Sequence, residues 1–149
     1  MQLRELMNRN VFTIKLGSTM HEAAEVLSRS WASDLMVVDD EGNFVGVLSE
    51  GDLIRAAMPR FDELIGAGNM GMPMIASFDT FVEQGAEIAN HTIDELVIRS
   101  PLTFAPTDDA LKAASAMLSK RIRRLPVVED GRLVGTVARR DMAVAVLKA

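Results

Sequence analysis

The feature that most constrains this chain is a stretch of sequence that occurs twice. GNFVGVLSEGDL begins at Gly42, and GRLVGTVARRDM begins at Gly131. Each runs from one glycine through an apolar segment to a second glycine, and ends on an aspartate followed by an apolar residue. Two copies are too few, and too far apart, for a solenoid, whose repeats are about 20–50 residues long. The repeat therefore predicts one duplicated supersecondary unit.

Each copy is predicted to fold as β-α-β-β-α. In the first copy, VFTI is a short strand, STMHEAAEVLSRS has apolar residues at helical spacing, and LMVVD is a buried strand. Thr19 and Glu22 have the spacing of a capping box at the start of that helix. FVGVLS completes a hairpin and EGDLIRAAM opens a closing helix. The second copy repeats this order with LTFA, DDALKAASAMLSK, LPVVE, LVGTVA and RRDMAVAVLKA.

One such unit would expose a face of its small sheet, whereas two units can bury these faces against each other. The predicted fold class is therefore α/β (α+β), with two βαββα units packed through their sheets about a pseudo-two-fold axis. Residues 1–58 are predicted to form unit 1, residues 59–92 an inserted helical linker, and residues 93–149 unit 2. Within the linker, GAGNMGMPM is predicted to be a loop. DTFVEQGAEIAN is predicted to be a helix that is N-capped by Asp79 or Thr80.

Composition narrows the class of protein. The formal net charge of −5 argues against nucleic acid as a partner. The chain has no cysteine, so it has neither disulfides nor thiolate chemistry. No apolar run approaches the roughly 18–20 residues that span a membrane, and MQLRELMNRN lacks the apolar segment of a signal peptide. We expect a cytoplasmic protein without a membrane partner.

No residues stand out as catalytic. His21 and His91 have no cysteine or carboxylate at a compelling metal-ligand spacing. No Ser-His-Asp set, P-loop or HExxH motif occurs. We therefore expect no enzymatic activity, no metal and no required cofactor.

LPVVEDGRLVGTVARRDM and its partner in the first half resemble the repeat of the tandem CBS-domain (cystathionine-β-synthase domain) pair, or Bateman module, of the stand-alone bacterial type. The resemblance covers about residues 3–58 and 93–147. It implies a regulatory module, often a homodimer, which acts on an effector protein. It also implies two clefts between the units for AMP, ADP, ATP or S-adenosylmethionine as a regulatory ligand.

The resemblance assigns ribose binding to Asp52 and Asp141, since a carboxylate offers two acceptor oxygens to two hydroxyl donors. Either residue could instead be an acidic group that favours the first turn of a helix. Ser49 would contact ribose or phosphate, or cap the helix. In the second copy the position of Ser49 is Ala138, which weakens a site that depends on Asp141.

Arg123 and Arg124 match basic positions that contact phosphate in the family, and a forked guanidinium suits phosphate oxygens. Arg139 and Arg140 are further candidates, or else solvated residues at the start of a helix. In the first copy Ser33 and Asp34 replace the arginine pair, and Asp34 would repel a phosphate.

On the family pattern each cleft mixes the two copies. The first cleft would combine Ser49, Asp52, Thr103, Phe104, Arg123, Arg124 and Leu125. The second would combine Asp141 with Thr13, Ile14, Ser33 and Asp34. The first has the better ribose and phosphate chemistry, so we expect the ligand there. The alternative is a dimerisation scaffold with empty clefts, which Ala138, Asp34 and Ile98 favour.

Overall fold

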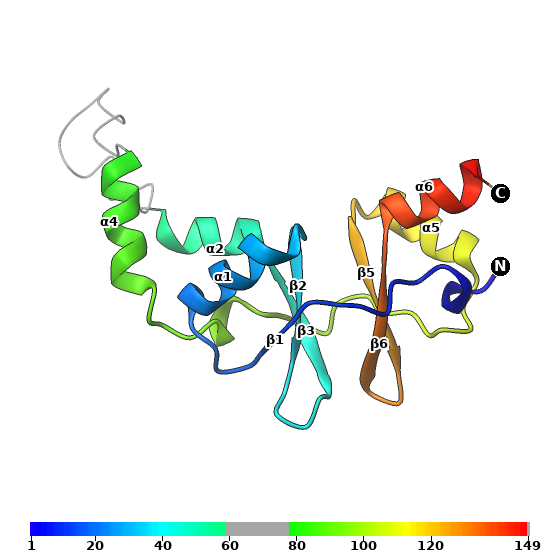
Figure 1. Cartoon of the computed structure of the whole chain (residues 1–149), viewed down its shortest axis with the longest axis horizontal. Coiled ribbons are helices and arrows are strands. Elements are labelled where there is room, and N and C mark those ends of the chain that lie inside the picture. Colours follow the sequence, from blue (N-terminus) through cyan, green and yellow to red (C-terminus); the bar gives the residue numbers. More distant parts are fainter. Residues whose placement is uncertain (59–77, 149) are drawn as a thin grey trace.

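The computed structural model describes residues 1–58 and 78–148. Figure 1 shows an elongated molecule with unit 1 and the helix α4 at one end and unit 2 at the other. Both chain ends lie beside unit 2. The mixed α/β architecture agrees with the predicted fold class.

Unit 1 contains β1 (Thr13–Lys15), α1 (Met20–Ser30), β2 (Asp34–Val38), β3 (Phe44–Ser49) and α2 (Glu50–Ala57). Strand β2 is central, with β1 parallel on one side and β3 antiparallel on the other. Its apolar residues Leu35 to Val38 are all buried, as the continuous apolar run predicts. The predicted capping box opens α1: the Glu22 N–H donates to Thr19 Oγ1, and the Thr19 N–H donates to Glu22 Oε2, both at 3.1 Å.

Unit 2 contains α5 (Ala110–Ser119), β5 (Arg124–Glu129), β6 (Arg132–Ala138) and α6 (Arg139–Leu147). The predicted strand LTFA is reduced to one parallel bridge between Phe104 and Val127. Phe104 is bonded on both sides, from its N–H to the Pro126 carbonyl and from the Val128 N–H to its own carbonyl. The next donors of such a parallel ladder would be the N–H groups of Pro106 and Pro126, which proline lacks. The strand therefore stops after one residue.

The segment that precedes each unit is built into the other unit. The short helix η1 (Leu3–Glu5) lies on unit 2, where the Leu3 N–H donates to the Asp108 carbonyl at 2.9 Å. The short helix η3 (Asp94–Leu96) and strand β4 (Ile98–Arg99) lie on unit 1, where β4 pairs with β3. The division of the chain at residues 58 and 93 therefore stays a prediction, since neither unit is formed from one continuous segment.

This exchange explains the second glycine of the repeated stretch. A Cβ added to Gly46 would collide with the carbonyl oxygen of Ile98, and one added to Gly135 would lie 2.9 Å from that of Asn8. Ile98 pairs with Val47, and Asn8 forms a bridge with Thr136 at the equivalent place in the repeat. Each glycine therefore makes room for the exchanged backbone.

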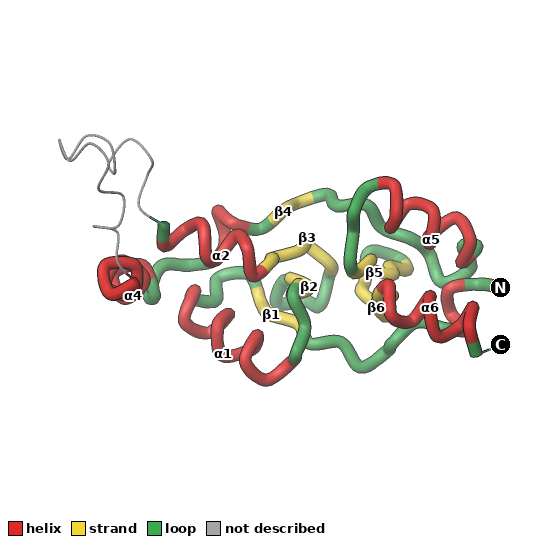
Figure 2. Tube along the Cα trace, turned by 90° about the horizontal axis from the view of Figure 1, so that it is seen from above, coloured by secondary structure: helices red, strands yellow, loops and turns green. Residues whose placement is uncertain are grey.

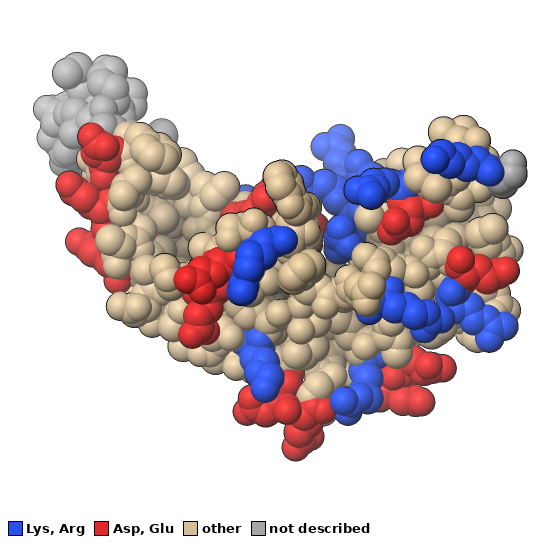
Figure 3. Space-filling model, in the orientation of Figure 1, with Lys and Arg blue, Asp and Glu red and all other residues tan. Residues whose placement is uncertain are grey.

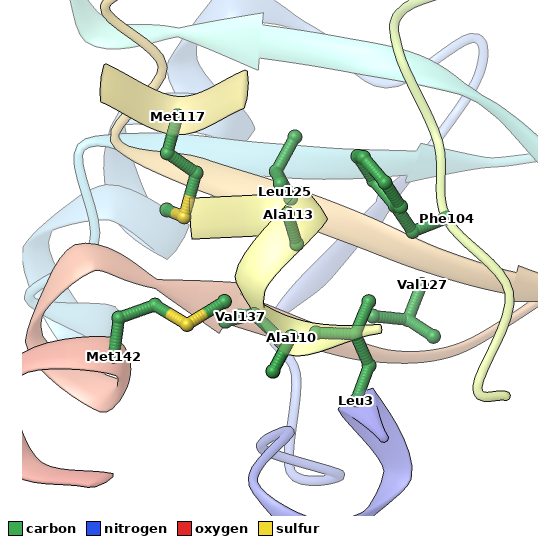
Figure 4. Close-up of a cluster of buried hydrophobic side chains, with 9 residues drawn as sticks. All are labelled: Leu3, Phe104, Ala110, Ala113, Met117, Leu125, Val127, Val137 and Met142. Atoms are coloured by element: carbon green, nitrogen blue, oxygen red, sulfur yellow. The ribbon is translucent and has the colours of Figure 1, made fainter. Parts of the chain in front are cut away.

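Each unit has its own core. Leu3 is fully buried in the core of unit 2, beside Phe104 and Leu125 (Figure 4). Ile93 is equally buried in the core of unit 1. Apolar side chains that alternate away from these cores, including Met36 and Pro126, are also buried. Figure 2 shows the two sheets lying between the helices of the two units, so these side chains fill the layer between the sheets.

The hairpins of the two units meet at the pseudo-two-fold axis, where Asn43 forms an antiparallel bridge with Arg132. These two positions are equivalent in the repeat, and the Phe44 N–H donates to the Gly131 carbonyl at 2.8 Å. Matched positions that pair with each other are the signature of an internal two-fold axis.

Helix α4 (Phe78–Ile88) confirms the predicted linker helix and lies against α1 and α2. Asp79 and Thr80, the predicted N-caps, lie within the helix rather than before it. The predicted loop at residues 66–74 lies outside the described residues. Among the described helices, none combines the length and apolarity that a membrane crossing requires.

Candidate functional site

A cavity of about 230 Å³ lies between the two units, where β5 of unit 2 begins opposite β3 and β4 of unit 1. It brings together three of the predicted binding residues, Arg123, Arg124 and Leu125. Val47, Ile98, Pro101 and Leu102 form apolar parts of its wall. A mixed wall of cations and aliphatic side chains can accept a ligand with an anionic end and an apolar body.

Arg124 is the best-anchored cation of this cavity. Its Nη1 donates to Oγ1 of Thr136 at 3.1 Å, and Thr136 is fully buried. Its Nε is buried and has no hydrogen-bond partner among the described residues. A buried donor without a partner costs free energy, and the cost is larger when the group is charged. The guanidinium is therefore held in place with an unused donor.

The cavity carries more positive than negative charge. Arg121, Arg123 and Arg124 line it together with a single carboxylate, Asp34. Asp34 accepts a hydrogen bond from the Ser33 hydroxyl at 3.2 Å, and within the described chain it forms no ion pair with these arginines. Asp34 was predicted in the second cleft, and the structure places it beside the cations.

The start of α2 holds the predicted ribose ligand. Ser49 is the N-cap, and its Oγ accepts from the Asp52 N–H at 3.1 Å and donates to Asp52 Oδ2 at 2.8 Å. Arg55 Nη2 donates to Asp52 Oδ1 at 2.5 Å. Partial burial alone would raise the pKa of Asp52, but the hydrogen bonds from Arg55 and Ser49 outweigh it and lower this pKa. Asp52 is therefore an ionised acceptor at neutral pH.

Ser49 and Asp52 lie next to the cavity but do not line it. Ser49 pairs with Asp34 across β2 and β3, and the Glu50 N–H donates to the Ser33 carbonyl at 3.0 Å. The start of α2 is thus fixed beside Asp34, which lines the cavity together with the arginines. The residues predicted to bind ribose and those predicted to bind phosphate therefore lie on neighbouring elements.

The start of α6 differs from that of α2. Asp141 Oδ2 accepts from the Ala138 N–H at 2.7 Å, while Ala138 has no side-chain acceptor to return a bond. Arg139 donates to the carbonyls of Ile122 and Met117, so its guanidinium is engaged at the end of α5. Arg140 is exposed in the first turn.

The remaining predicted residues are dispersed. Thr103 is exposed, and Phe104 belongs to the core of unit 2. Ile14 belongs to the core of unit 1, while Thr13 lines a separate cavity of about 240 Å³ beside the hairpins. Phe104 and Ile14, which were predicted to line the two clefts, are therefore core residues in this structure.

The histidines are structurally separate. His21 Nε2 lies 3.2 Å from Oε1 of Glu25, one helical turn away on exposed α1. Within the described part of the chain, no three His, Cys, Asp or Glu residues are grouped as metal ligands.

Arg121 is not among the binding residues predicted from the sequence, although it lines the cavity. Its backbone is left-handed, with φ of 55°, as is that of Trp31 at the equivalent position of the repeat, with φ of 56°. The repeat alignment pairs these residues, but nothing in either side chain shows that the backbone turns there. Arg121 shares the wall of the cavity with Arg124 and Leu125, the first residues of β5.

Comparison with known proteins identifies one family. The model of the CBS domain matches residues 3–59 and 93–148. Among curated proteins, the uncharacterized protein MJ1225 of Methanocaldococcus jannaschii is 28% identical over 139 residues, which cover 93% of this chain and 40% of that protein. CBSX2 of Arabidopsis thaliana is 28% identical over 148 residues, which cover 94% of this chain and 60% of that protein. The chain thus spans about half the length of these relatives.

Solved structures share the fold. The crystal structure of CBSX2 in complex with AMP superposes with a TM-score of 0.72 at 24% identity, covering 99% of this chain and 96% of that one. The CBS domain pair of protein MJ0100, in complex with 5′-methylthioadenosine and S-adenosylmethionine, superposes with a TM-score of 0.69 at 20% identity, covering 99% and 97%. Both copies of the repeat and the segment between them are covered in each case.

Proposed function

Because the chain belongs to the CBS-domain family and contains a tandem pair of these domains, we propose that it is a regulatory module that binds an adenosine nucleotide between its two units. The ligand is expected to act through binding alone, without a reaction. It biases the arrangement of the units, and an effector protein responds to that arrangement.

The observation that carries this proposal is the unused donor of Arg124. A phosphate oxygen is a suitable acceptor for a guanidinium held in a fixed orientation, and the net positive charge of the cavity favours an anion. Arg121 and Arg123 would add to this attraction. Asp52 supports the ribose end, since each of its oxygens retains acceptor capacity beyond the bonds from Ser49 and Arg55.

The ligands of the solved relatives indicate the class of molecule. AMP, 5′-methylthioadenosine and S-adenosylmethionine share an adenosine, and among them only AMP has a phosphate. S-adenosylmethionine has a cationic sulfonium, which three arginines would repel. We therefore expect AMP, ADP or ATP to bind in preference to S-adenosylmethionine.

The size of the cavity supports a role in signalling. Pockets that bind drug-sized molecules usually measure about 300–1,000 Å³. This cavity measures about 230 Å³. A whole nucleotide would have to widen the space between the units. A ligand shifts a conformational equilibrium only if it binds one arrangement better than the other, and widening supplies that difference.

Calorimetric titration with AMP, ADP, ATP and S-adenosylmethionine tests the proposal. We expect a phosphate-bearing nucleotide to bind, and Arg124→Gln and Asp52→Ala each to weaken binding at least tenfold. Asp141→Ala, at the other helix start, and Arg29→Gln, on α1 and outside the residues that line the cavity, should leave affinity within about twofold. If none of the four compounds binds at millimolar concentration, nucleotide sensing is wrong.

The second candidate function is a dimerisation scaffold whose clefts stay empty. Asp34 favours it, because this carboxylate shares the cavity with the arginines and would repel a phosphate. Measuring nucleotide binding by the Asp34→Asn variant distinguishes between the two proposed functions. For a sensor it should tighten nucleotide binding, whereas for a scaffold it should leave binding undetectable.

A further inference from the structure

Two of the three arginines in the wall of the cavity lie on a turn between α5 and β5. We call residues 121–123 the arginine turn, after the exposed side chains of Arg121 and Arg123. Arg121 has φ of 55°, in the left-handed region where glycine is the usual residue after a helix. Another residue keeps this conformation only where its surroundings hold it. The arginine turn therefore requires contacts from elsewhere in unit 2.

Arg139, the first residue of α6, supplies such contacts. Its Nε donates to the Ile122 carbonyl at 3.0 Å, and its backbone N–H donates to the Arg123 carbonyl at 3.1 Å. Its Nη2 donates to the Met117 carbonyl in the last turn of α5 at 3.4 Å. The same Met117 carbonyl accepts from the Ile122 N–H at 2.9 Å. Arg139 thus joins the arginine turn to both α5 and α6.

Arg139 contacts the arginine turn from outside the cavity. It lines the groove between α5 and α6, and the described wall of the cavity does not include it. Both bonds of its guanidinium go to carbonyl oxygens near the end of α5, where the helix dipole favours a cation. In this position the side chain supports the turn that carries the cavity arginines and does not itself face a ligand.

The repeat distinguishes this contact from a general requirement of the fold. Glu50 occupies the position of Arg139, and its N–H donates to the Ser33 carbonyl at 3.0 Å, which is the equivalent backbone bond. A carboxylate has no N–H group to donate to the neighbouring Ala32 carbonyl. Residues 31–33 of the first copy also carry no cation. The side-chain contact therefore occurs in the copy whose turn contains arginines.

The arginines near this turn are close to one another and lack acidic partners. Figure 3 shows basic side chains gathered where β5 and α6 begin. Among the described residues, neither Arg139 nor any of the three arginines that line the cavity forms an ion pair. Like charges repel, so an unsupported arginine turn would move its cations apart. The contacts that Arg139 makes with the backbone oppose this movement.

We propose that Arg139 is a positioning residue for the phosphate end of the nucleotide site. It holds the arginine turn so that Arg121 and Arg123 stay in the cavity wall, and it does not touch the ligand. This role rests on the proposed nucleotide function. Because the two arginines would act on phosphate groups and not on adenosine, loss of the Arg139 contacts should weaken a ligand according to the number of its phosphates. General damage to the fold would weaken all ligands alike.

Calorimetric titration with adenosine, AMP and ATP tests this graded effect. We expect Arg139→Met to weaken ATP binding at least tenfold and AMP binding about threefold, and to change adenosine binding less than twofold. Lys112→Met is the matched control, because it removes the same charge from an exposed residue of α5. It should leave all three affinities within about twofold. An equal loss for the three ligands, or an unchanged ATP affinity in Arg139→Met, would overturn the proposal.

Hydrogen exchange without ligand tests the positioning separately from the proposed function. The Ile122 amide hydrogen should exchange at least tenfold faster in Arg139→Met than in wild type, while the central amides of β5 and β6 change less than twofold. Unchanged exchange at Ile122 would overturn the role of Arg139 even if nucleotides bind. If wild type bound no nucleotide but Ile122 exchanged faster in the variant, the proposed function would fail, whereas the support of the arginine turn by Arg139 would hold.

Discussion

The carboxylate of Asp52 is bonded to two side chains, Ser49 and Arg55, while that of Asp141 is bonded to the backbone of Ala138. The repeat aligns the two aspartates, and sequence alone treated them as equal ribose ligands apart from the change of Ser49 to Ala138. The hydrogen-bond partners of the two aspartates also differ because of a second change in the repeat. The position of Arg55 is Val144 in the second copy, which offers no hydrogen bond.

The Asp52 contacts predict a pH effect on stability. The folded state lowers the pKa of Asp52 below the unfolded value of about 3.9. Its contribution is therefore present above the unfolded pKa and is lost as pH falls through the folded pKa. Arg55→Gln should reduce the difference in unfolding free energy between pH 7 and pH 3, measured with urea. Arg29→Gln, whose guanidinium bonds to the Glu25 carbonyl instead, is the control. An unchanged difference in Arg55→Gln would contradict the assignment.

The glycines of the repeated stretch predict a graded cost. Gly46→Ala should destabilise the protein by about 1–3 kcal/mol, because the new methyl group would meet the rigid backbone carbonyl of Ile98. Gly135→Ala should cost less, since part of its contact is the adaptable Met7 side chain. Gly85→Ala in α4 has open space and should stabilise by about 0.5–1 kcal/mol. Urea unfolding of the three variants checks the order.

At the scale of elements, the two closing helices begin differently. Helix α2 begins with a serine N-cap, and α6 begins at Ala138, which cannot cap. Ala138→Ser should stabilise the protein by about 1 kcal/mol by accepting the Asp141 N–H, and Ser49→Ala should destabilise it by a similar amount. Thermal and urea unfolding measure both. Equal effects of the same sign would show that the caps do not determine these helix starts.

Most elements could be predicted from sequence because local signals define them. The capping box of Thr19 and the N-cap Ser49 are sequence patterns, and the buried run of β2 is a composition pattern. LTFA could not be predicted in the same way. Its failure as a strand depends on which N–H groups a neighbouring strand requires, and Pro126 lies far from it in sequence.

The candidate site was predicted in part. Arg123, Arg124 and Leu125 are adjacent in sequence and stay together in space. The position of Asp34 could not be predicted, because the repeat shows which residues are equivalent but not which of them meet across the two-fold axis. Phe104 and Ile14 are apolar residues that a core accepts as well as a ligand wall does, and the structure places both in cores.

At the scale of the whole molecule, the exchanged segments predict a single cooperative unfolding transition. Leu3 belongs to the core of unit 2 although it precedes unit 1 in the chain. Leu3→Ala should destabilise the protein by about 2–5 kcal/mol. Hydrogen exchange should show the loss of protection in the strands of both units. Ile54→Ala, at a residue that is 52% exposed, should have little effect. Loss of protection confined to unit 2 would show that the units unfold independently.

The exchange of Leu3 and Ile93 also has a consequence for how the chain could be divided. Residues 1–58 contain the core residue that residues 78–149 lack, and the reverse holds for Ile93. The two halves are joined by interlocked cores as well as by the peptide chain. Produced as two separate polypeptides, each should be unfolded alone, and the pair should assemble into one particle. Although it is one polypeptide, the protein is built like a heterodimer whose two subunits have exchanged their first segments.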